Sequence, residues 1–303
     1  MFINLGYNIL RKDGNLAFII PISITSSEAM TGVHNLLLKN CELIKISSYA
    51  VRPEPVFENA MVNTSILLFK KTYSICKQLL STKMHRRKGQ TFSLQKLIDN
   101  LEFTDVKQFL LYGRIPKIGT DIEKSILSKL STQTKISEYI SEKGKKIFYR
   151  AAGGRYFKVI TNYTTGSSAE KYIVFSKEYA DAIGCILSSN LSFWFYQIYS
   201  DNLNWKSYEI ENFTIPKINT NTMNQLNNLY AEYLEDIEKN ANIRFSSGES
   251  TYHVESFKEY KIGRSKYIID KIDDLICPLY GLSPEEIDFI KKYEIEFRVD
   301  DED

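Results

Sequence analysis

The sequence predicts an α/β domain, then an α+β domain, then a helical C-terminal segment. Three observations support this prediction. Strand-like apolar runs appear at Leu16–Ile20 and Thr64–Phe69, and a helical pattern joins the first run to a strand over Glu42–Tyr49, as in a crossover between parallel, paired strands. Short mixed elements rich in Ser, Thr and Tyr follow from Thr91. Two amphipathic helical patterns come last, at Met223–Ile237 and Ile268–Leu279.

The first domain is expected to contain two helices and three strands. In chain order they are a helix over Phe2–Leu10, a strand over Leu16–Ile22, a helix opened by Thr25 and Glu28, and strands over Glu42–Tyr49 and Val62–Phe69. The near-continuous apolar run of the first strand is typical of burial on both faces. The last two strands have only a loop between them, so we expect them to be antiparallel.

The domain boundaries follow from changes in this pattern. We expect the α/β part over residues 1–72, a basic linker over 73–90, the α+β domain over 91–218 and the helical segment over 219–303. In the helical segment, Ser283 and Glu286 form a capping box around Pro284. Trp194 and Phe195 are expected in the core, and Asp273 and Asp274 on a solvated helix face.

Composition excludes several classes of protein. The chain has 303 residues, of which 43% are hydrophobic and 25% charged, as expected of a folded protein. No apolar run approaches the roughly 20 residues of a membrane helix, so no membrane segment is expected. The four cysteines form no C-x-x-C pair and the three histidines have no metal-ligand spacing. We therefore expect reduced thiols, no metal site and a cytoplasmic protein.

A basic segment in the middle of the chain predicts a polyanionic partner. Between Lys143 and Lys158 there are six basic residues, no acidic residue and four interleaved aromatic rings. Cationic side chains contact phosphates, and paired glycines allow close backbone approach. The predicted DNA contacts in this segment are Lys145, Lys146, Arg150, Gly153, Gly154, Arg155, Tyr156 and Lys158. The alternative is a solvated strand pair with a glycine turn.

Two other places are weaker candidates for contact with DNA. Arg86 and Arg87 belong to the run KMHRRK, which is equally typical of a solvated linker. Trp205 and Lys206 lie in a polar segment that could enter a groove of the duplex.

The loop Ala50–Ala60 is expected to emerge at the carboxyl edge of the sheet, where open α/β sheets bind ligands. Phe57 is its only aromatic residue, and prolines stiffen the loop. An exposed ring here would stack on a flat ligand. The alternative is that Phe57 turns inward onto the core.

Several runs together resemble one family. GNLAFIIPISITSS (14–27), ELIKISSY (42–49) and VFENAMVNTSILLFKK (56–71) resemble the rear of the catalytic domain of TaqI-like adenine-specific DNA methyltransferases. FYRAAGGRYFKV (148–159), residues 187–218 and residues 268–290 are similar to the downstream parts of that family, including its target-recognition domain.

The resemblance implies a fold, a chemistry and partners. It implies the rear half of a Rossmann-like methyltransferase sheet over 1–72 and a target-recognition domain over 91–218. The complete enzyme would use S-adenosylmethionine to methylate adenine in double-stranded DNA within a restriction–modification or defence system. Phe57 matches the aromatic residue that stacks on the flipped adenine, a contact worth roughly 1–3 kcal/mol.

The chain departs from the family where the chemistry lies. It has no (N/D)-P-P-(Y/F) motif, since none of its seven prolines are adjacent, and no glycine-bearing cofactor loop before the sheet. We therefore expect no catalytic residue, no bound cofactor and no methylation by this chain alone. An N-terminal methyltransferase half, on a separate chain or in missing sequence, would supply them.

Two other interpretations remain open. The chain is also compatible with a non-catalytic DNA-specificity subunit, which would dock through the sheet edge near Leu16–Ile20. The third interpretation is an inactive remnant.

Overall fold

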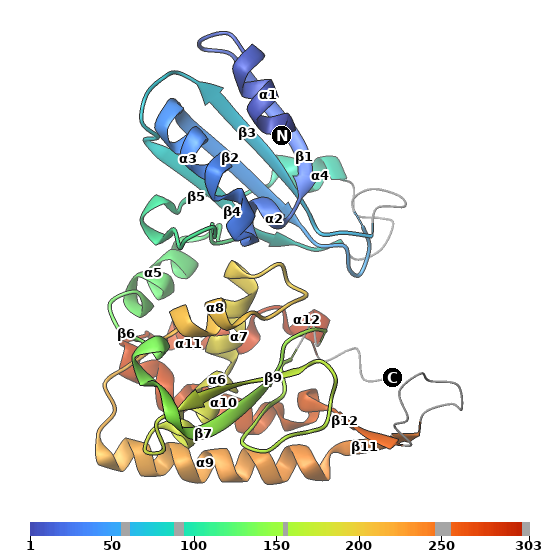
Figure 1. Ribbon diagram of the computed structural model, residues 1–303, viewed down its shortest axis with the longest axis vertical. Coiled ribbons are helices and arrows are strands. Elements are labelled where there is room, and N and C mark those ends of the chain that lie inside the picture. Colours follow the sequence, from blue (N-terminus) through green and yellow to red (C-terminus); the bar gives the residue numbers. More distant parts are fainter. Residues whose placement is uncertain (56–60, 88–93, 154–156, 246–255, 299–303) are drawn as a thin grey trace. The chain divides into compact units, whose positions relative to one another are not determined.

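The computed structural model describes residues 1–55, 61–87, 94–153, 157–245 and 256–298. The chain forms two compact units (Figure 1). The first contains Met1–Ser128 and Gln197–Asn202, and the second contains Lys129–Tyr196 and Leu203–Asp303.

The first unit is built on a mixed five-stranded sheet with the order β1-β3-β2-β4-β5. Its strands are β1 (Asn15–Pro21), β2 (Cys41–Tyr49), β3 (Thr64–Lys71), β4 (Gln78–His85) and β5 (Thr104–Asp105). β2 and β4 are parallel, and every other neighbouring pair is antiparallel. The expected antiparallel pairing of β2 with β3 is confirmed. The expected parallel pairing of β1 with β2 is wrong. The two strands run in the same direction, but β3 lies between them and pairs with both.

Short helices accompany this sheet. They are α1 (Phe2–Ile9), α2 (Ser23–Ser26), η1 (Glu28–Met30), α3 (Thr31–Asn40), α4 (Leu94–Asp99), η2 (Lys107–Phe109) and α5 (Asp121–Leu130). α1 packs on β1 through Gly6, where a Cβ would lie only 2.7 Å from the Leu16 side chain. The buried Lys71 ammonium donates to the carbonyls of Tyr7 and Leu10 at the end of α1, 2.8 and 2.7 Å away. A cation there complements the partial negative charge of the helix C-terminus.

Two expectations for this unit are corrected. β1 alternates between exposed and half-buried residues and is not buried on both faces, because it is the edge strand. The basic linker expected over 73–90 contains β4, which pairs with β2 from Leu43 opposite Gln78 to Tyr49 opposite His85. The charged residues obscured this strand, although Leu79 and Met84 are buried.

The second unit combines small antiparallel sheets with helices. Its strands are β6 (Thr134–Lys135), β7 (Ile140–Arg150), β8 (Ile160–Thr161), β9 (Glu170–Phe175), β10 (Thr214–Ile215), β11 (Ala241–Phe245) and β12 (Ser256–Tyr260). Its helices are η3 (Ile136–Tyr139), α6 (Ala180–Leu187), α7 (Asn190–Tyr199), α8 (Ser207–Asn212), α9 (Thr220–Lys239), η4 (Ile262–Ser265), α10 (Lys266–Ile276), η5 (Cys277–Tyr280), α11 (Pro284–Lys292) and α12 (Ile295–Arg298).

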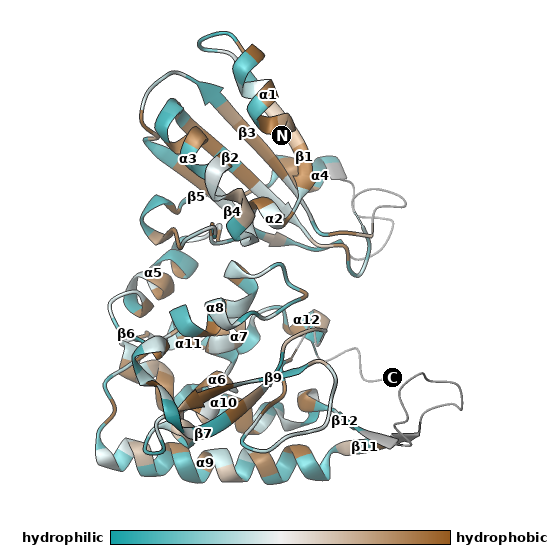
Figure 2. Cartoon of the chain, in the orientation of Figure 1, coloured by the Kyte–Doolittle hydropathy of each residue, from teal (hydrophilic) through white to brown (hydrophobic). Residues whose placement is uncertain are grey.

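The helical predictions for this unit largely hold. α9 buries Leu226, Tyr230, Tyr233 and Ile237 on one stripe, and polar and apolar residues alternate along it in Figure 2. The capping box of Ser283 and Glu286 is present, and Trp194 and Phe195 are buried. The expectation that Asp273 lies on a solvated helix face is wrong, because this residue is fully buried. Its carboxylate accepts hydrogen bonds from the backbone N–H groups of Asn190 and Leu191, both 3.0 Å away, at the start of α7.

No helix in the described ranges is long and apolar enough to cross a membrane. All four cysteines are free and buried. Within the same ranges, no cluster of His, Cys, Asp or Glu could hold a metal ion.

Candidate nucleic-acid interface

The first candidate region lies at the carboxyl ends of the parallel strands β2 and β4. Tyr49 and His85 are register partners at these ends, and the Ala50 N–H donates to the His85 carbonyl at 2.8 Å. Residues 50–55 and 86–87 therefore leave the sheet together. This edge is where open α/β sheets bind ligands.

Hydrogen bonds hold the loop that follows β2. Arg87 Nη1 donates to the Pro55 carbonyl at 3.0 Å, and Arg86 Nη1 donates to the Arg52 carbonyl at 3.3 Å. Asn63 Oδ1 accepts from the Val51 N–H at 2.8 Å. The two arginines predicted as DNA contacts thus position the chain up to Pro55. Phe57 itself lies outside the described residues.

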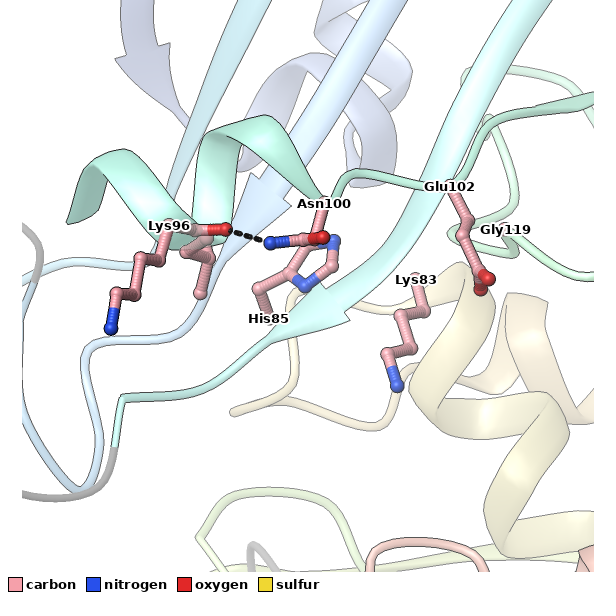
Figure 3. Close-up of a pocket in the computed structure, with 7 residues that line it drawn as sticks. Lys83, His85, Lys96, Asn100, Glu102 and Gly119 are labelled. Atoms are coloured by element: carbon pink, nitrogen blue, oxygen red, sulfur yellow. Dashed lines mark hydrogen bonds between the residues drawn. The ribbon is translucent and has the colours of Figure 1, made fainter. Parts of the chain in front are cut away.

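A cavity of about 410 Å³ lies beside the end of β4 (Figure 3). Its lining is formed by Lys83, His85, Lys96, Leu97, Asn100, Glu102 and Gly119. Gly119 lets two segments approach closely, since a Cβ there would lie 2.8 Å from the Glu102 carbonyl and 3.0 Å from the Lys83 N. The two lysines and one carboxylate give the lining a small excess of positive charge.

Burial keeps the histidine of this cavity neutral. Burial lowers the pKa of His85 to about 4, and the nearby Lys83 charge acts in the same direction. The buried Nε2 atom of His85 has no hydrogen-bond partner among the described residues. The described lining can therefore donate hydrogen bonds to a polar ligand, and it contains a single carboxylate, that of Glu102.

The second candidate region is the sheet β8-β7-β9, which contains part of the predicted basic segment. Lys146 and Arg150 are exposed on β7, whereas Lys145 points to the other face and pairs with Asp181 of α6 at 2.6 Å. Lys146 Nζ lies 4.2 Å from the centroid of the Tyr172 ring. Gly153 adopts a positive φ of 69°. Gly154, Arg155 and Tyr156 lie outside the described residues.

Two predicted DNA contacts are corrected by burial. Trp205 is only 2% exposed and packs against Tyr149 and Tyr196, with ring centroids 5.8 and 5.6 Å apart. Lys158 is 6% exposed, and its ammonium donates to the Gly153 carbonyl at 2.7 Å and lies over the Tyr196 ring. Both side chains stabilise the fold. Lys206 is exposed at the start of α8, where its N–H donates to Glu209 at 2.8 Å.

Sequence reasoning missed residues in both regions. His85 and Asn100 in the first unit and Lys171 and Tyr172 in the second were not singled out. The stretch EKYIVF (170–175) carries a strand signal, with β-branched and aromatic residues, that would have identified the partner of β7.

Comparisons with known proteins give little further information. No family model matches the chain, and no curated protein matches it. Among solved structures, it is similar to the Type IIL restriction-modification enzyme MmeI in complex with DNA, with a TM-score of 0.47 and 12% identity over 94% of this chain and 49% of that one. It is also similar to the ATP-dependent Type ISP restriction-modification enzyme LlaBIII bound to DNA, with a TM-score of 0.33 and 8% identity over 99% of this chain and 34% of that one. The chain thus spans half or less of the length of these proteins.

Proposed function

We propose that this chain is the C-terminal part of a site-specific adenine DNA methyltransferase from a restriction–modification or defence system. In this proposal it supplies DNA recognition and the clamp for a flipped base. An N-terminal part supplies the catalytic motif and holds S-adenosylmethionine.

The main support is the position of the loop that leads to Phe57. It leaves β2 at the carboxyl edge of two parallel strands, and Arg86, Arg87 and Asn63 hold its described part by hydrogen bonds. A loop held in place at this edge can position an aromatic ring so that it stacks on an extruded base. The cationic sheet face of the second unit supports contact with phosphates.

The proposed N-terminal partner is supported by an unusual apolar surface. β1 is an edge strand, and no strand in the described ranges pairs with its outer side. Ile19 on β1 is 56% exposed, and α1 exposes Phe2, Leu5 and Ile9. Exposed edges that carry apolar residues favour pairing with another strand. The same surface also suits the alternative, a specificity subunit that docks on a partner without completing its active site.

Two measurements on this chain test the proposal. We expect salt-dependent binding to duplex DNA in fluorescence anisotropy, and no tight binding of labelled S-adenosylmethionine in equilibrium dialysis. Tight cofactor binding by the chain alone would place the donor site here and contradict the proposal. Absence of DNA binding would refute its recognition role.

A third measurement tests the base clamp in the complete enzyme. With the N-terminal part supplied, Phe57→Ala should lower methyl transfer and leave duplex affinity unchanged. Unchanged turnover would remove the clamp assignment. A complex that forms but never methylates DNA would favour the specificity-subunit alternative.

A further inference from the structure

One face of the sheet β8-β7-β9 carries an exposed pair of aromatic rings. Residues along β7 alternate, so that Ile147 and Tyr149 are buried while Lys146, Phe148 and Arg150 lie on the opposite face. Helix α6 packs against β7 and β8. Because Lys145 shares the buried side and pairs with Asp181 of α6, that helix covers the buried face. The other face is therefore the solvent face.

The two rings are cross-strand partners. Phe148 of β7 is in register with Tyr172 of β9, and their ring centroids are 5.7 Å apart. Tyr172 is 52% exposed and Phe148 is half-buried. Exposed neighbouring rings on a sheet face form a platform on which the flat face of a nucleobase can stack.

Cations flank this platform at both ends. Lys146 lies over the Tyr172 ring at 4.2 Å, and Arg150 is exposed two residues beyond Phe148 on the same face. Lys171 is also exposed on β9, but it is the register partner of Tyr149 and therefore lies on the opposite face. The platform therefore combines aromatic surface with groups that attract phosphates.

The acidic residue on this face, Glu170, is held away from the rings by hydrogen bonds to a neighbouring turn. Glu170 is the register partner of Arg150. Its carboxylate accepts hydrogen bonds from the Thr164 hydroxyl, the Thr165 hydroxyl and the Thr165 N–H, each within 2.7 Å. Glu142 is exposed near the start of β7. The exposed cations that share the face of the two rings are Lys146 and Arg150.

We propose that this face binds single-stranded DNA, with an unpaired base stacked on Phe148 and Tyr172 and the adjoining phosphates held by Lys146 and Arg150. Duplex DNA hides the faces of its bases inside the stack, so only an unpaired base presents the surface that these rings match. The inference rests on the proposed DNA function. It specifies single-stranded DNA as the ligand and this sheet face as the surface that binds it.

Fluorescence anisotropy on the full chain tests this inference. The probes are labelled oligo(dT), a duplex of the same length, an abasic oligonucleotide of the same length and oligo(rU). Tyr172→Ala should weaken oligo(dT) binding about 5- to 100-fold, because one stacking contact is lost. Tyr172→Phe should leave it within about twofold, because the ring remains. The abasic strand should bind wild type about as weakly as oligo(dT) binds Tyr172→Ala.

A matched control is available in the same unit. Tyr267 on α10 is 54% exposed and lies off the sheet, so Tyr267→Ala should leave oligo(dT) affinity unchanged. Equal losses for Tyr172→Ala and Tyr267→Ala, or tighter binding of oligo(rU) than of oligo(dT), would overturn the inference.

The outcome also separates this inference from the proposed function. If the duplex binds and oligo(dT) binding does not depend on Tyr172, the inference fails and duplex recognition stands. If oligo(dT) binding depends on Tyr172 and the duplex does not bind, the inference stands and duplex recognition fails. Binding to neither probe would refute both.

Discussion

The two basic segments of this chain look alike in sequence and differ in structure. Arg86 and Arg87, which follow β4, donate to backbone carbonyls of the loop after β2. Lys146 and Arg150, on β7, are exposed. Lys146 lies over the Tyr172 ring at 4.2 Å, and Arg150 Nε donates to the Ala152 carbonyl at 3.0 Å. The first segment uses its charge to hold a loop. The second exposes Lys146 and Arg150 on one face of a sheet.

A run of basic residues therefore does not by itself identify a binding surface. Within one run, strand alternation sends Lys145 to an ion pair with Asp181 and Lys146 to the solvent face. Burial then removes Lys158 from the predicted set of contacts.

The largest effect is expected at Gly144 in β7. A Cβ at this position would lie 1.8 Å from the Phe175 carbonyl oxygen, which is backbone and cannot move without displacing β9. Gly144→Ala should lower the free energy of unfolding by about 3 kcal/mol. Hydrogen exchange should show lost protection in β7 and β9, and unchanged protection in β2 and β3.

Gly32 provides the control for this substitution. It lies in α3, and a Cβ there would meet no atom within 4 Å. Gly32→Ala should leave stability unchanged or raise it by up to about 1 kcal/mol. Equal destabilisation by the two substitutions would show that β7 and β9 do not pack as described.

The next largest effect is expected at Arg87. Arg87→Ala removes the charged donor to the Pro55 carbonyl and should cost about 2 kcal/mol in urea unfolding. It should also speed proteolysis within Arg52–Pro55, because the loop loses an anchor. Arg11, which is exposed, is the control, and Arg11→Ala should change stability by less than about 0.5 kcal/mol. A loss of DNA affinity with stability intact would instead return Arg87 to the set of DNA contacts.

Some helices and strands could be predicted from the sequence, and others could not. Local patterns predicted α1, α3, α9 and the strands β1 to β3, because each has its own periodicity or capping residues. They missed β4, whose apolar residues are interrupted by Ser81, Thr82 and Lys83 and are recognisable mainly through pairing with β2. Tertiary partners are not local information.

Some features of the candidate sites could likewise be predicted from the sequence, and others depend on the fold. The loop after β2 leaves the sheet at the expected edge, and strand β7 exposes Lys146 and Arg150, but their contact with DNA stays a prediction. The sequence could not foresee that Trp205 packs on Tyr149 and Tyr196, because a tryptophan in a polar segment gives no sign of distant partners. The aromatic platform required the register of β7 with β9, which only the fold provides.

A smaller effect is expected from pH, with opposite signs in the two units. Burial raises the pKa of Asp273 in the second unit to about 6 from its ordinary value of 3.8. The folded state therefore binds the proton more tightly, and stability from this group is lost as pH rises from about 4 to about 6. Burial lowers the pKa of His85 in the first unit to about 4 from 6.5, so its contribution is lost as pH falls through that window.

Substitutions isolate these two contributions. The free energy of unfolding of His85→Gln, relative to that of wild type, should be higher near pH 5 than near pH 7 by about 1 kcal/mol. Asp273→Asn should be destabilising throughout, because it loses an acceptor for the α7 N–H groups, and less so near pH 7 than near pH 5. Urea unfolding at the two pH values measures both differences. Parallel pH responses of the two variants would contradict the assigned protonation states.

The smallest effect on stability, and the sharpest test of the comparison, is expected at Arg150. Arg150→Ala should change the free energy of unfolding by less than about 0.5 kcal/mol, because the side chain is exposed. It should reduce the slope of log affinity for DNA against log salt concentration by about 1, the value expected for one lost phosphate contact. Arg150→Lys should retain the slope, because the charge remains.

Lys145 separates the role of strand position from that of charge alone. It is adjacent to Lys146 and of the same residue type, but its ammonium is held by Asp181 on the opposite face. Lys145→Ala should therefore leave the salt slope unchanged, whereas Lys146→Ala should reduce it by about 1. If both substitutions reduce the slope equally, the net charge of the segment drives binding. The alternation of β7 would then not select which residues meet the phosphates.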